Sequence, residues 1–297
     1  MTRRLSGPFL LALLFVTAYP SRAGAQSAAE YGPATGTLVI AGGGQLDGTG
    51  IYERFIELGG GKDTGRFVIV PTAGGNRTDS GQVRAYDAEA VLRSWKARGV
   101  RHVTMLHTHE PAVANTEAFV NDLRTATGVW FNGGRQWNIV DSYAGTRTYA
   151  EFHKVLARGG VIGGSSAGAT IQGSYLVRGD TRGPQIVMTE EKNHQLGFEF
   201  LRRSAIDQHI NTRNRWDDIM PLISQRSDLL GLGLSEGTAI VVTRDQFEVI
   251  GKWMVAVHDN TRAYQPWEKP YFVLAPGDRY DMAGRRILRT PARGRGR

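Results

Sequence analysis

Apolar residues occur along this chain as short unbroken runs that alternate with segments in which they recur every three or four positions. The unbroken runs predict β-strands at 37–41, 66–71, 102–106, 129–131 and 161–162. The periodic segments between them predict helices at 85–98, 116–126 and 148–156. Continuously apolar strands that alternate with helices are typical of a parallel sheet covered on both faces. The pattern therefore predicts an α/β fold.

The second half of the chain has a different pattern. Short apolar runs joined by tight turns lie at 238–243, 247–251, 255–257 and 271–274. They predict an antiparallel ribbon that completes the sheet. Neither a linker nor an internal repeat interrupts residues 36–284, so we expect a single domain at 26–284.

The N-terminal residues have the pattern of a signal peptide. Two arginines precede an apolar run at 9–19, and a cleavage site of the A-x-A type ends at Ala25. We predict that residues 1–25 are removed and that the protein is secreted, to the periplasm or the medium, without a stable membrane anchor. The alternative is an uncleaved anchor, which the short run and the helix-breaking Pro20 disfavour.

The net charge of +8 is concentrated at the two ends of the chain. Nine of the 36 basic side chains lie in the predicted signal peptide or the last thirteen residues, so residues 26–284 carry 27 basic against 28 acidic side chains. A nearly neutral body implies no groove for nucleic acid. The arginine-rich tail at 285–297 is predicted to be disordered, and contact with an anionic surface is the alternative to a solvated terminus. The chain has no cysteine, so its core must supply the stability.

The segment 160–168 carries the strongest chemical signal. Gly164 and Gly168 flank Ser166 in the pattern G-x-S-x-G, directly after a predicted strand and before a helical segment. This order is typical of a nucleophile elbow, in which the serine is exposed and the next backbone N–H stabilises an oxyanion. The motif predicts cleavage of an acyl bond. A glycine-rich loop before an ordinary helix is the alternative, and the apolar strand before the motif favours the elbow.

A serine nucleophile needs a base, and the base needs an acid that orients it. Among seven histidines, His209 has the most polar and basic surroundings, at 205–215. It is either a catalytic base or an incidental histidine on a solvated helix face, and composition does not separate these interpretations. Glu236 lies in a glycine-lined loop before a predicted strand, which suits either an orienting acid or a turn residue facing water.

Two other motifs suggest ligands but lack supporting residues. His107 and His109 are spaced to face the same side of a strand, as in some zinc sites. No second ligand pair with suitable spacing is evident, so we interpret them as structural or pocket-rim residues and predict neither a metal nor a cofactor. The glycines at 42–44 lack both G-x-G-x-x-G and the lysine of a P-loop, which argues against a nucleotide loop.

Several separated motifs occur in the order found in one known family. They are the glycine-ended first strand, 131–136, the elbow at 164–168, 207–215 and 233–239. With these motifs the chain resembles the cyanophycinases, serine peptidases of family S51, which also includes aspartyl dipeptidase. The resemblance implies a flavodoxin-like α/β fold, a three-layer sandwich similar to the class I glutamine amidotransferases with a mostly parallel sheet.

The resemblance also implies a role for each residue of the site. Ser166 is the nucleophile, His209 is the general base and then the acid, and Glu236 orients His209. The backbone N–H groups of Gly134 and Ala167 form the oxyanion hole. The implied substrate-binding residues are Gln136, Asp207, Gln208, Arg213 and Arg215. These residue types suit the chemistry, because guanidinium groups bind carboxylates and a carboxylate binds a substrate guanidinium.

The function that the resemblance implies is that of a secreted serine exopeptidase. It hydrolyses cyanophycin, a poly-aspartate with arginine on each side chain, to β-Asp-Arg dipeptides through an acyl-enzyme. Arg135 stands where the family usually has aspartate, and Asp218 lies where a third arginine is usual. Both changes reverse a charge near the substrate, so an α- or β-aspartyl dipeptidase is an alternative. A non-catalytic ligand-binding protein is the alternative of another class. Relatives form dimers, which makes a homodimer a further expectation.

Overall fold

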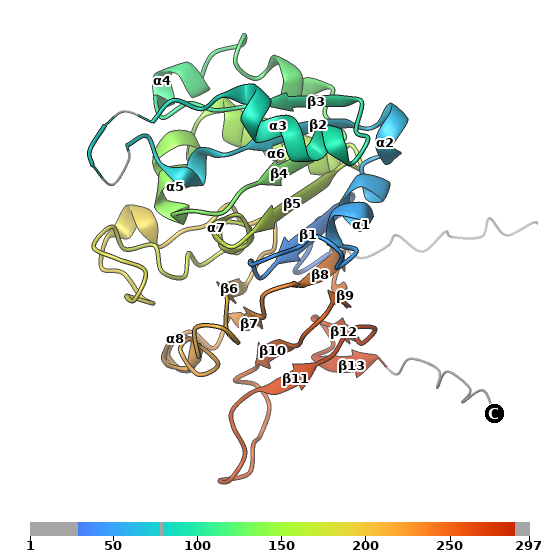
Figure 1. The fold of residues 1–297 in the computed structure, drawn as a ribbon. Helices are drawn as coiled ribbons and strands as arrows, with labels where there is room; N and C mark the ends of the chain where they lie inside the picture. Colours follow the sequence, from blue (N-terminus) through green and yellow to red (C-terminus); the bar gives the residue numbers. More distant parts are fainter. Residues whose placement is uncertain (1–28, 78–79, 83, 289–297) are drawn as a thin grey trace, which may run out of the picture.

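A parallel core forms the centre of the molecule (Figure 1). The computed structural model describes residues 29–77, 80–82 and 84–288, so the predicted signal peptide and residues 289–297 of the predicted tail lie outside it. The core strands are β1 Thr37–Ala41, β2 Arg66–Val70, β3 His102–Met105, β4 Gly128–Phe131 and β5 Val161–Ser165. They pair in parallel in the order β1-β5-β4-β2-β3. All of the strands predicted in the first half of the chain are confirmed.

Antiparallel strands extend this core beyond β1 to a nine-stranded sheet. They are β8 Thr238–Thr243, β9 Gln246–Gly251, β12 Arg279–Asp281 and β13 Arg286–Leu288. The prediction of an antiparallel ribbon is confirmed for 238–251. The predicted boundary at 284 is too early, because Ile287 pairs with Tyr280 of β12 and the sheet continues to Leu288.

A second, four-stranded sheet contains the remaining strands, in the order β11-β10-β7-β6. Their bounds are β6 Ser204–Gln208, β7 Leu230–Leu234, β10 Val255–His258 and β11 Phe272–Leu274. The runs at 255–257 and 271–274 are therefore strands, but they do not belong to the main sheet as predicted. In the parallel pair β6–β7, Gln208 lies opposite Leu234, so both strands end at the same edge.

Helices cover both faces of the parallel core (Figure 1). They are α1 Ile51–Leu58, α2 Gly61–Thr64, α3 Ala88–Ala97, α4 Pro111–Ala114, α5 Gln136–Tyr143, α6 Arg147–Ala157, α7 Ala167–Thr170 and α8 Met220–Gln225. Short 3₁₀ turns occur at Thr72–Gly74, Asn121–Arg124 and Lys192–His194. Within the described ranges, no helix combines the length and apolar character needed to cross a bilayer.

Alternate strand residues separate the core into two layers. On one face, Trp130 of β4 packs with Phe55 of α1 and Trp95 of α3. On the other face, Phe131 packs with Phe152 of α6 in a cluster that also includes apolar residues of the second sheet. Adjacent residues of β4 thus point into different layers, as the two-residue period of a strand requires. The result is a mixed sheet with a parallel core between two helical layers.

The prediction of a helix at 116–126 is wrong. That segment forms turns and the 3₁₀ helix Asn121–Arg124. Its buried residues are Val120, Leu123 and Ala126, which are three positions apart. A three-residue spacing matches the period of a 3₁₀ turn as well as one face of an α-helix, so the apolar pattern alone did not distinguish them. The predicted helices at 85–98 and 148–156 correspond to α3 and α6.

Candidate active site

The elbow around Ser166 joins β5 to α7 at the carboxyl edge of the parallel core. Ser166 has φ 57° and ψ −115°, and its N–H donates to the carbonyl of Ala41 at the end of β1 (3.1 Å). Both flanking glycines are required by close approach of the backbone. A Cβ at Gly164 lies 2.2 Å from the carbonyl oxygen of Gly168, and a Cβ at Gly168 lies 2.1 Å from that of Phe131. The G-x-S-x-G pattern therefore reflects a steric need of this turn.

Ser166, His209 and Glu236 form one continuous hydrogen-bonded relay. The Oγ of Ser166 lies 2.8 Å from Nε2 of His209. The Nδ1 of His209 lies 2.5 Å from Oε1 of Glu236. With Nδ1–H donating to the carboxylate, Nε2 is left as an acceptor for the serine hydroxyl. Three residues that are far apart in the sequence thus have the geometry of a nucleophile, a base and an orienting acid.

Parallel strand pairing brings these residues together. His209 directly follows β6, and Glu236 lies just after β7, so the matched ends of the β6–β7 pair place them side by side. The N–H of His209 donates to the carbonyl of Gly42, which follows β1 (3.0 Å). The N–H of Glu236 donates to Oδ1 of Asn211 (2.9 Å). Each side chain of the relay is therefore held by backbone hydrogen bonds as well as by its neighbours.

The glycines after β1 make room for the relay. A Cβ at Gly43, whose φ is +101°, lies only 2.3 Å from Cε1 of His209. The sequence argued against a nucleotide loop at these glycines. In the structure, they allow the backbone to lie close to the imidazole of His209. Sequence reasoning located this triplet at a strand end, where α/β folds place ligands, but did not connect it with a histidine far along the chain.

Burial and charge act in opposite directions on the relay. Burial lowers the pKa of His209, the hydrogen bond to Glu236 raises it, and the charges of Arg213 and Arg215 lower it, with a net decrease. Burial raises the pKa of Glu236, but hydrogen bonds from His209 and Thr212 hold it below its usual value. The site therefore favours a neutral imidazole beside an ionised carboxylate, which is the state that a general base needs.

The two predicted oxyanion-hole residues come from the elbow itself and from the turn after β4. Ala167 follows Ser166 and begins α7. Gly134 comes from the turn after β4, next to Gly133, where a Cβ would lie 3.2 Å from Cβ of Ser166. Gly134 has φ 147°, and the N–H of Arg135 donates to the carbonyl of Ala73 (2.7 Å). This hydrogen bond ties the turn after β4 to the segment after β2, beside the nucleophile.

The side chains of two predicted substrate-binding residues are hydrogen bonded to other groups of the protein itself. The Nε2 of Gln136, which is buried, donates to the carbonyls of Val177 (2.6 Å) and Arg178 (2.7 Å). The carboxylate of Asp207 accepts two hydrogen bonds, both 2.8 Å long, from Nε and Nη2 of Arg178. Arg178 also donates to Asp218 (2.6 Å). Asp207 was expected to receive a substrate guanidinium, but a guanidinium of this chain already takes that place.

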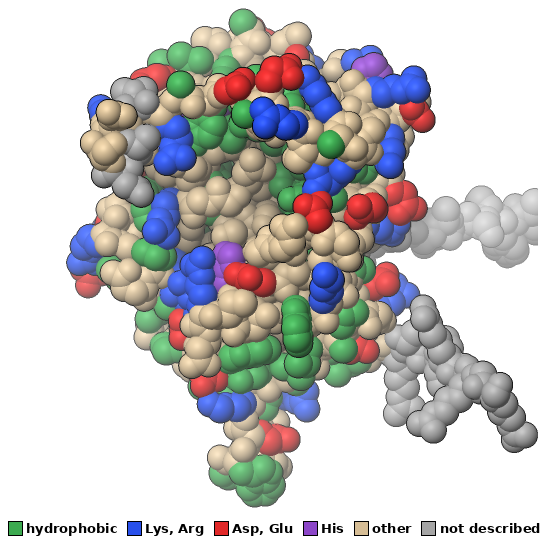
Figure 2. Space-filling view, viewed as in Figure 1, with side chains coloured by type: hydrophobic (Ala, Val, Ile, Leu, Met, Phe, Trp, Pro, Cys, Tyr) green, Lys and Arg blue, Asp and Glu red, His purple; other side chains and the backbone are tan. Residues whose placement is uncertain are grey.

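Two of the other predicted substrate-binding residues have a buried polar atom without a partner among the described residues. The Oε1 of buried Gln208 and the Nη1 of Arg215 accept or donate no hydrogen bond to any described residue. Arg213 is exposed, one turn after His209. Figure 2 shows basic side chains beside a histidine and an acidic side chain at the border of a shallow hollow. The charges of Arg213 and Arg215 act on His209, so positive charge lies close to the relay.

His107 and His109 hydrogen bond to hydroxyl groups. The Nδ1 of His107 lies 3.0 Å from Oγ1 of Thr72, and the Nδ1 of His109 lies 3.2 Å from Oγ of Ser142. Burial and the neighbouring His109 lower the pKa of His107 to about 4. The described part of the chain contains no group of three or more His, Cys, Asp or Glu side chains placed to hold a metal ion. The hydrogen bonds of the pair tie the segment after β3 to the 3₁₀ turn Thr72–Gly74 and to α5.

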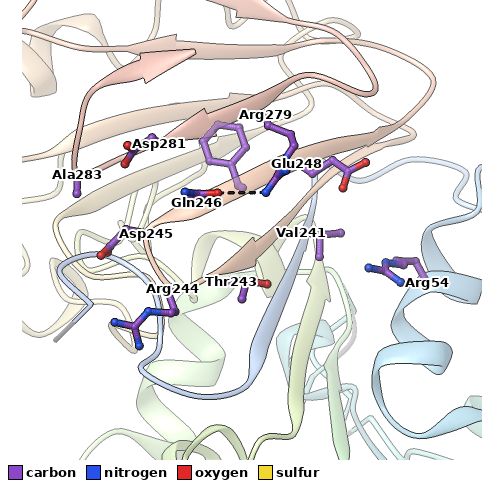
Figure 3. A pocket seen from close by; sticks show the side chains of 11 residues that line it. Arg54, Val241, Thr243, Arg244, Asp245, Gln246, Glu248, Arg279, Asp281 and Ala283 are labelled. Atoms are coloured by element: carbon purple, nitrogen blue, oxygen red, sulfur yellow. Dashed lines mark hydrogen bonds between the residues drawn. The ribbon is translucent and has the colours of Figure 1, made fainter. Parts of the chain in front are cut away.

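An open pocket of about 650 Å³ lies away from the relay, over β8, β9 and β12 (Figure 3). Its lining mixes basic side chains such as Arg54 and Arg279 with acidic ones such as Asp245 and Glu248. None of the predicted site residues contributes to it. We assign the site by the geometry of the relay rather than by the size of a pocket.

Fold and relay together define the class of this protein as a serine hydrolase with an α/β fold, a parallel core and a nucleophile elbow. The model of Peptidase family S51 matches residues 38–250. The chain belongs to this family of serine peptidases.

Curated relatives agree with this assignment, and solved structures share the fold. The chain is 26% identical over 233 residues to the cyanophycinase of Geminocystis herdmanii, covering 75% of this chain and 80% of the relative. It is 29% identical over 229 residues to the cyanophycinase of Synechococcus elongatus, covering 75% and 68%. A crystal structure of a peptidase from an acI-B1 actinobacterium matches with a TM-score of 0.60 at 20% identity, covering 83% of this chain and 97% of that one. A putative peptidase E from Listeria monocytogenes matches with a TM-score of 0.51 at 17% identity, covering 73% and 98%.

Proposed function

We propose that this protein hydrolyses aspartyl peptide bonds through an acyl-enzyme formed on Ser166. The observation that carries the proposal is the relay, with distances of 2.8 Å from Ser166 to His209 and 2.5 Å from His209 to Glu236. The first is the hydrogen bond along which the hydroxyl proton moves to the imidazole as the nucleophile attacks, and the second holds the imidazole in orientation. The strained backbone of Ser166 supports the proposal, because an exposed elbow serine adopts such a conformation.

The proposed reaction has two halves. In the first, Oγ of Ser166 attacks the scissile carbonyl carbon while Nε2 of His209 takes the hydroxyl proton. The N–H groups of Gly134 and Ala167 donate to the oxyanion. When the C–N bond breaks, His209 returns the proton to the leaving amine. In the second, His209 takes a proton from water, the hydroxide attacks the acyl-enzyme, and the proton returns to Ser166 as the acid product leaves.

Cyanophycin is the first candidate substrate, and the product would be β-Asp-Arg. The cyanophycinase names of the relatives support this choice. The test is incubation of residues 26–297 with insoluble cyanophycin and mass analysis of the soluble fraction, with Ser166→Ala in parallel. Release of β-Asp-Arg by the wild-type protein alone supports both the substrate and the nucleophile. Equal release by both proteins would overturn the role of Ser166.

An aspartyl dipeptidase is the second candidate. It is favoured by the ion pair between Arg178 and Asp207, because this carboxylate is not free to bind a substrate arginine. In the same assay, an intact polymer together with cleavage of small aspartyl dipeptides would select this function. Binding without hydrolysis of any of these compounds by the wild-type protein would instead support a non-catalytic ligand-binding protein.

We also propose that the protein acts outside the cytoplasm, on the basis of the predicted signal peptide. Expression of the full chain, followed by N-terminal sequencing of the extracytoplasmic fraction, tests this proposal. A mature N-terminus at Gln26 is expected, and retention of the full-length chain in the cytoplasm would overturn it.

A further inference from the structure

A second group of basic side chains lies on the oxyanion-hole side of Ser166. A pocket of about 410 Å³ includes Gly134 in its wall. Arg77, Arg84 and Arg135 line it together with backbone of the segment after β2 and of the turn after β4. The charged side chains among these residues are all arginines. A ligand in this pocket therefore touches the backbone next to the proposed oxyanion hole and meets only positive charge.

Hydrogen bonds hold the wall of this pocket in place. The N–H of Arg84 donates to the carbonyl of Asn76 (2.7 Å). The hydroxyl of Tyr86 donates to the carbonyl of Gly75 (2.9 Å), and the amide of Asn138 donates to that of Ala73 (3.2 Å). Together with the bond from the N–H of Arg135 to Ala73, these contacts join the segment after β2 to the turn after β4. The arginines thus extend from a backbone that is held next to the reaction centre.

The relay has basic side chains on its other side as well. Arg213 and Arg215 follow His209, and their charges lower its pKa. The nearby carboxylates of Asp207 and Asp218 are both bound to Arg178. Positive charge is therefore available to a substrate on both sides of Ser166, whereas these two carboxylates are already paired.

We infer that the pocket formed by Arg77, Arg84 and Arg135 binds a carboxylate of the substrate, so that this enzyme prefers peptides with free acidic groups to arginine-capped ones. Guanidinium groups bind carboxylates with strong, charge-assisted hydrogen bonds. The carboxylate is either the free α-carboxylate of the aspartyl residue that is transferred to Ser166 or the side-chain carboxylate of the leaving residue. This inference rests on the proposed function and specifies its substrate class.

Matched pairs of peptides test the inference, because each pair differs by one charge and hardly in size. β-Asp-Glu and β-Asp-Gln differ in the leaving residue. β-Asp-Gln and the same peptide with its aspartyl α-carboxylate amidated differ in the transferred residue. The wild-type protein is expected to favour the acidic member of at least one pair by about tenfold in kcat/KM, the scale of one charge-assisted hydrogen bond. The pair that shows the preference identifies which carboxylate the pocket binds.

The double variant Arg84→Gln/Arg135→Gln is expected to reduce this preference to less than about threefold. Arg101→Gln is the matched control. Arg101 directly precedes β3, so it lies at the amino ends of the parallel strands, away from the pocket, and it pairs with Asp63 (2.8 Å). This control should keep the preference of the wild-type protein. Thermal unfolding of all variants checks that the fold is retained.

Binding to the Ser166→Ala protein separates the inference from the proposed function. Calorimetric titration with β-Asp-Glu, β-Asp-Gln and the amidated peptide measures the same preference without hydrolysis. Selective binding that the two arginine substitutions remove supports the inference, even if the wild-type protein hydrolyses none of the peptides and the proposed function fails. Hydrolysis with equal preference within both pairs, or a preference that survives the double variant, overturns the inference and leaves the proposed function standing.

Discussion

Gly43→Ala tests whether the glycine loop after β1 sets the position of the proposed catalytic base. A Cβ at this position lies 2.3 Å from Cε1, 2.7 Å from Nε2 and 2.8 Å from Nδ1 of His209. Ordinary van der Waals contact begins at 3.4 Å, so the imidazole must retreat by about 1.1 Å. It is hydrogen bonded to Ser166 and Glu236, and such a movement lengthens or bends both of these bonds.

The expected effect is large because catalysis depends on this alignment. A displacement of about 1 Å in a reacting group costs on the order of 100-fold in rate. We therefore expect kcat/KM for aspartyl peptides to fall by about 100-fold or more. The positive φ of +101° adds a stability cost of about 1–2 kcal/mol, because alanine is strained there.

A second glycine of the same loop provides the control. Gly48 has φ +69°, but nothing lies within 4 Å of a Cβ at that position. Gly48→Ala thus carries a backbone cost without a clash with the imidazole. Initial rates and thermal unfolding would be measured for both variants in parallel. Activity of Gly43→Ala within threefold of Gly48→Ala would refute the idea that this loop positions His209.

Three further predictions concern the proposed catalytic mechanism. Glu236→Gln keeps the shape of the side chain but removes its charge, so kcat should fall by about 10³–10⁴-fold; a loss below tenfold in steady-state assays would contradict its orienting role. His209 must be neutral to accept a proton, so activity is lost as the pH falls through its lowered pKa. Arg213→Ala removes a charge that lowers this pKa and should move the acid limb of the kcat/KM profile to higher pH, whereas an unmoved limb would argue against this coupling. EDTA should leave the rate unchanged, and strong inhibition would overturn the metal-free mechanism.

Local features of the fold could be predicted from the sequence because they depend on neighbouring residues. The elbow combines an apolar run with small residues around Ser166, and each of these signals lies within a few positions of the others. The parallel strands could also be predicted from the sequence, because a buried strand is apolar along its whole length. The helix prediction for 116–126 was wrong because an apolar spacing of three residues suits both a 3₁₀ turn and an α-helix.

The partners of the serine were a different problem. Local composition left two interpretations open for His209, and a resemblance to a family was needed to select it. The structure adds the cause of the arrangement, which is the pairing of Gln208 with Leu234 and of Ala41 with Ser165. These pairings align the ends of strands that are distant in the sequence.

The order of residues along the chain by itself determined the class of fold, the elbow and the set of candidate side chains. Only the tertiary structure decided which of those side chains are available. Asp207 pairs with Arg178, 29 positions earlier, and no pattern in the sequence indicates this contact. Likewise, Gly43 is needed because an imidazole from another sheet lies against it. A sequence specifies the chemistry of each side chain. Whether that side chain is free to bind a substrate depends on the neighbours that only folding brings within hydrogen-bond distance.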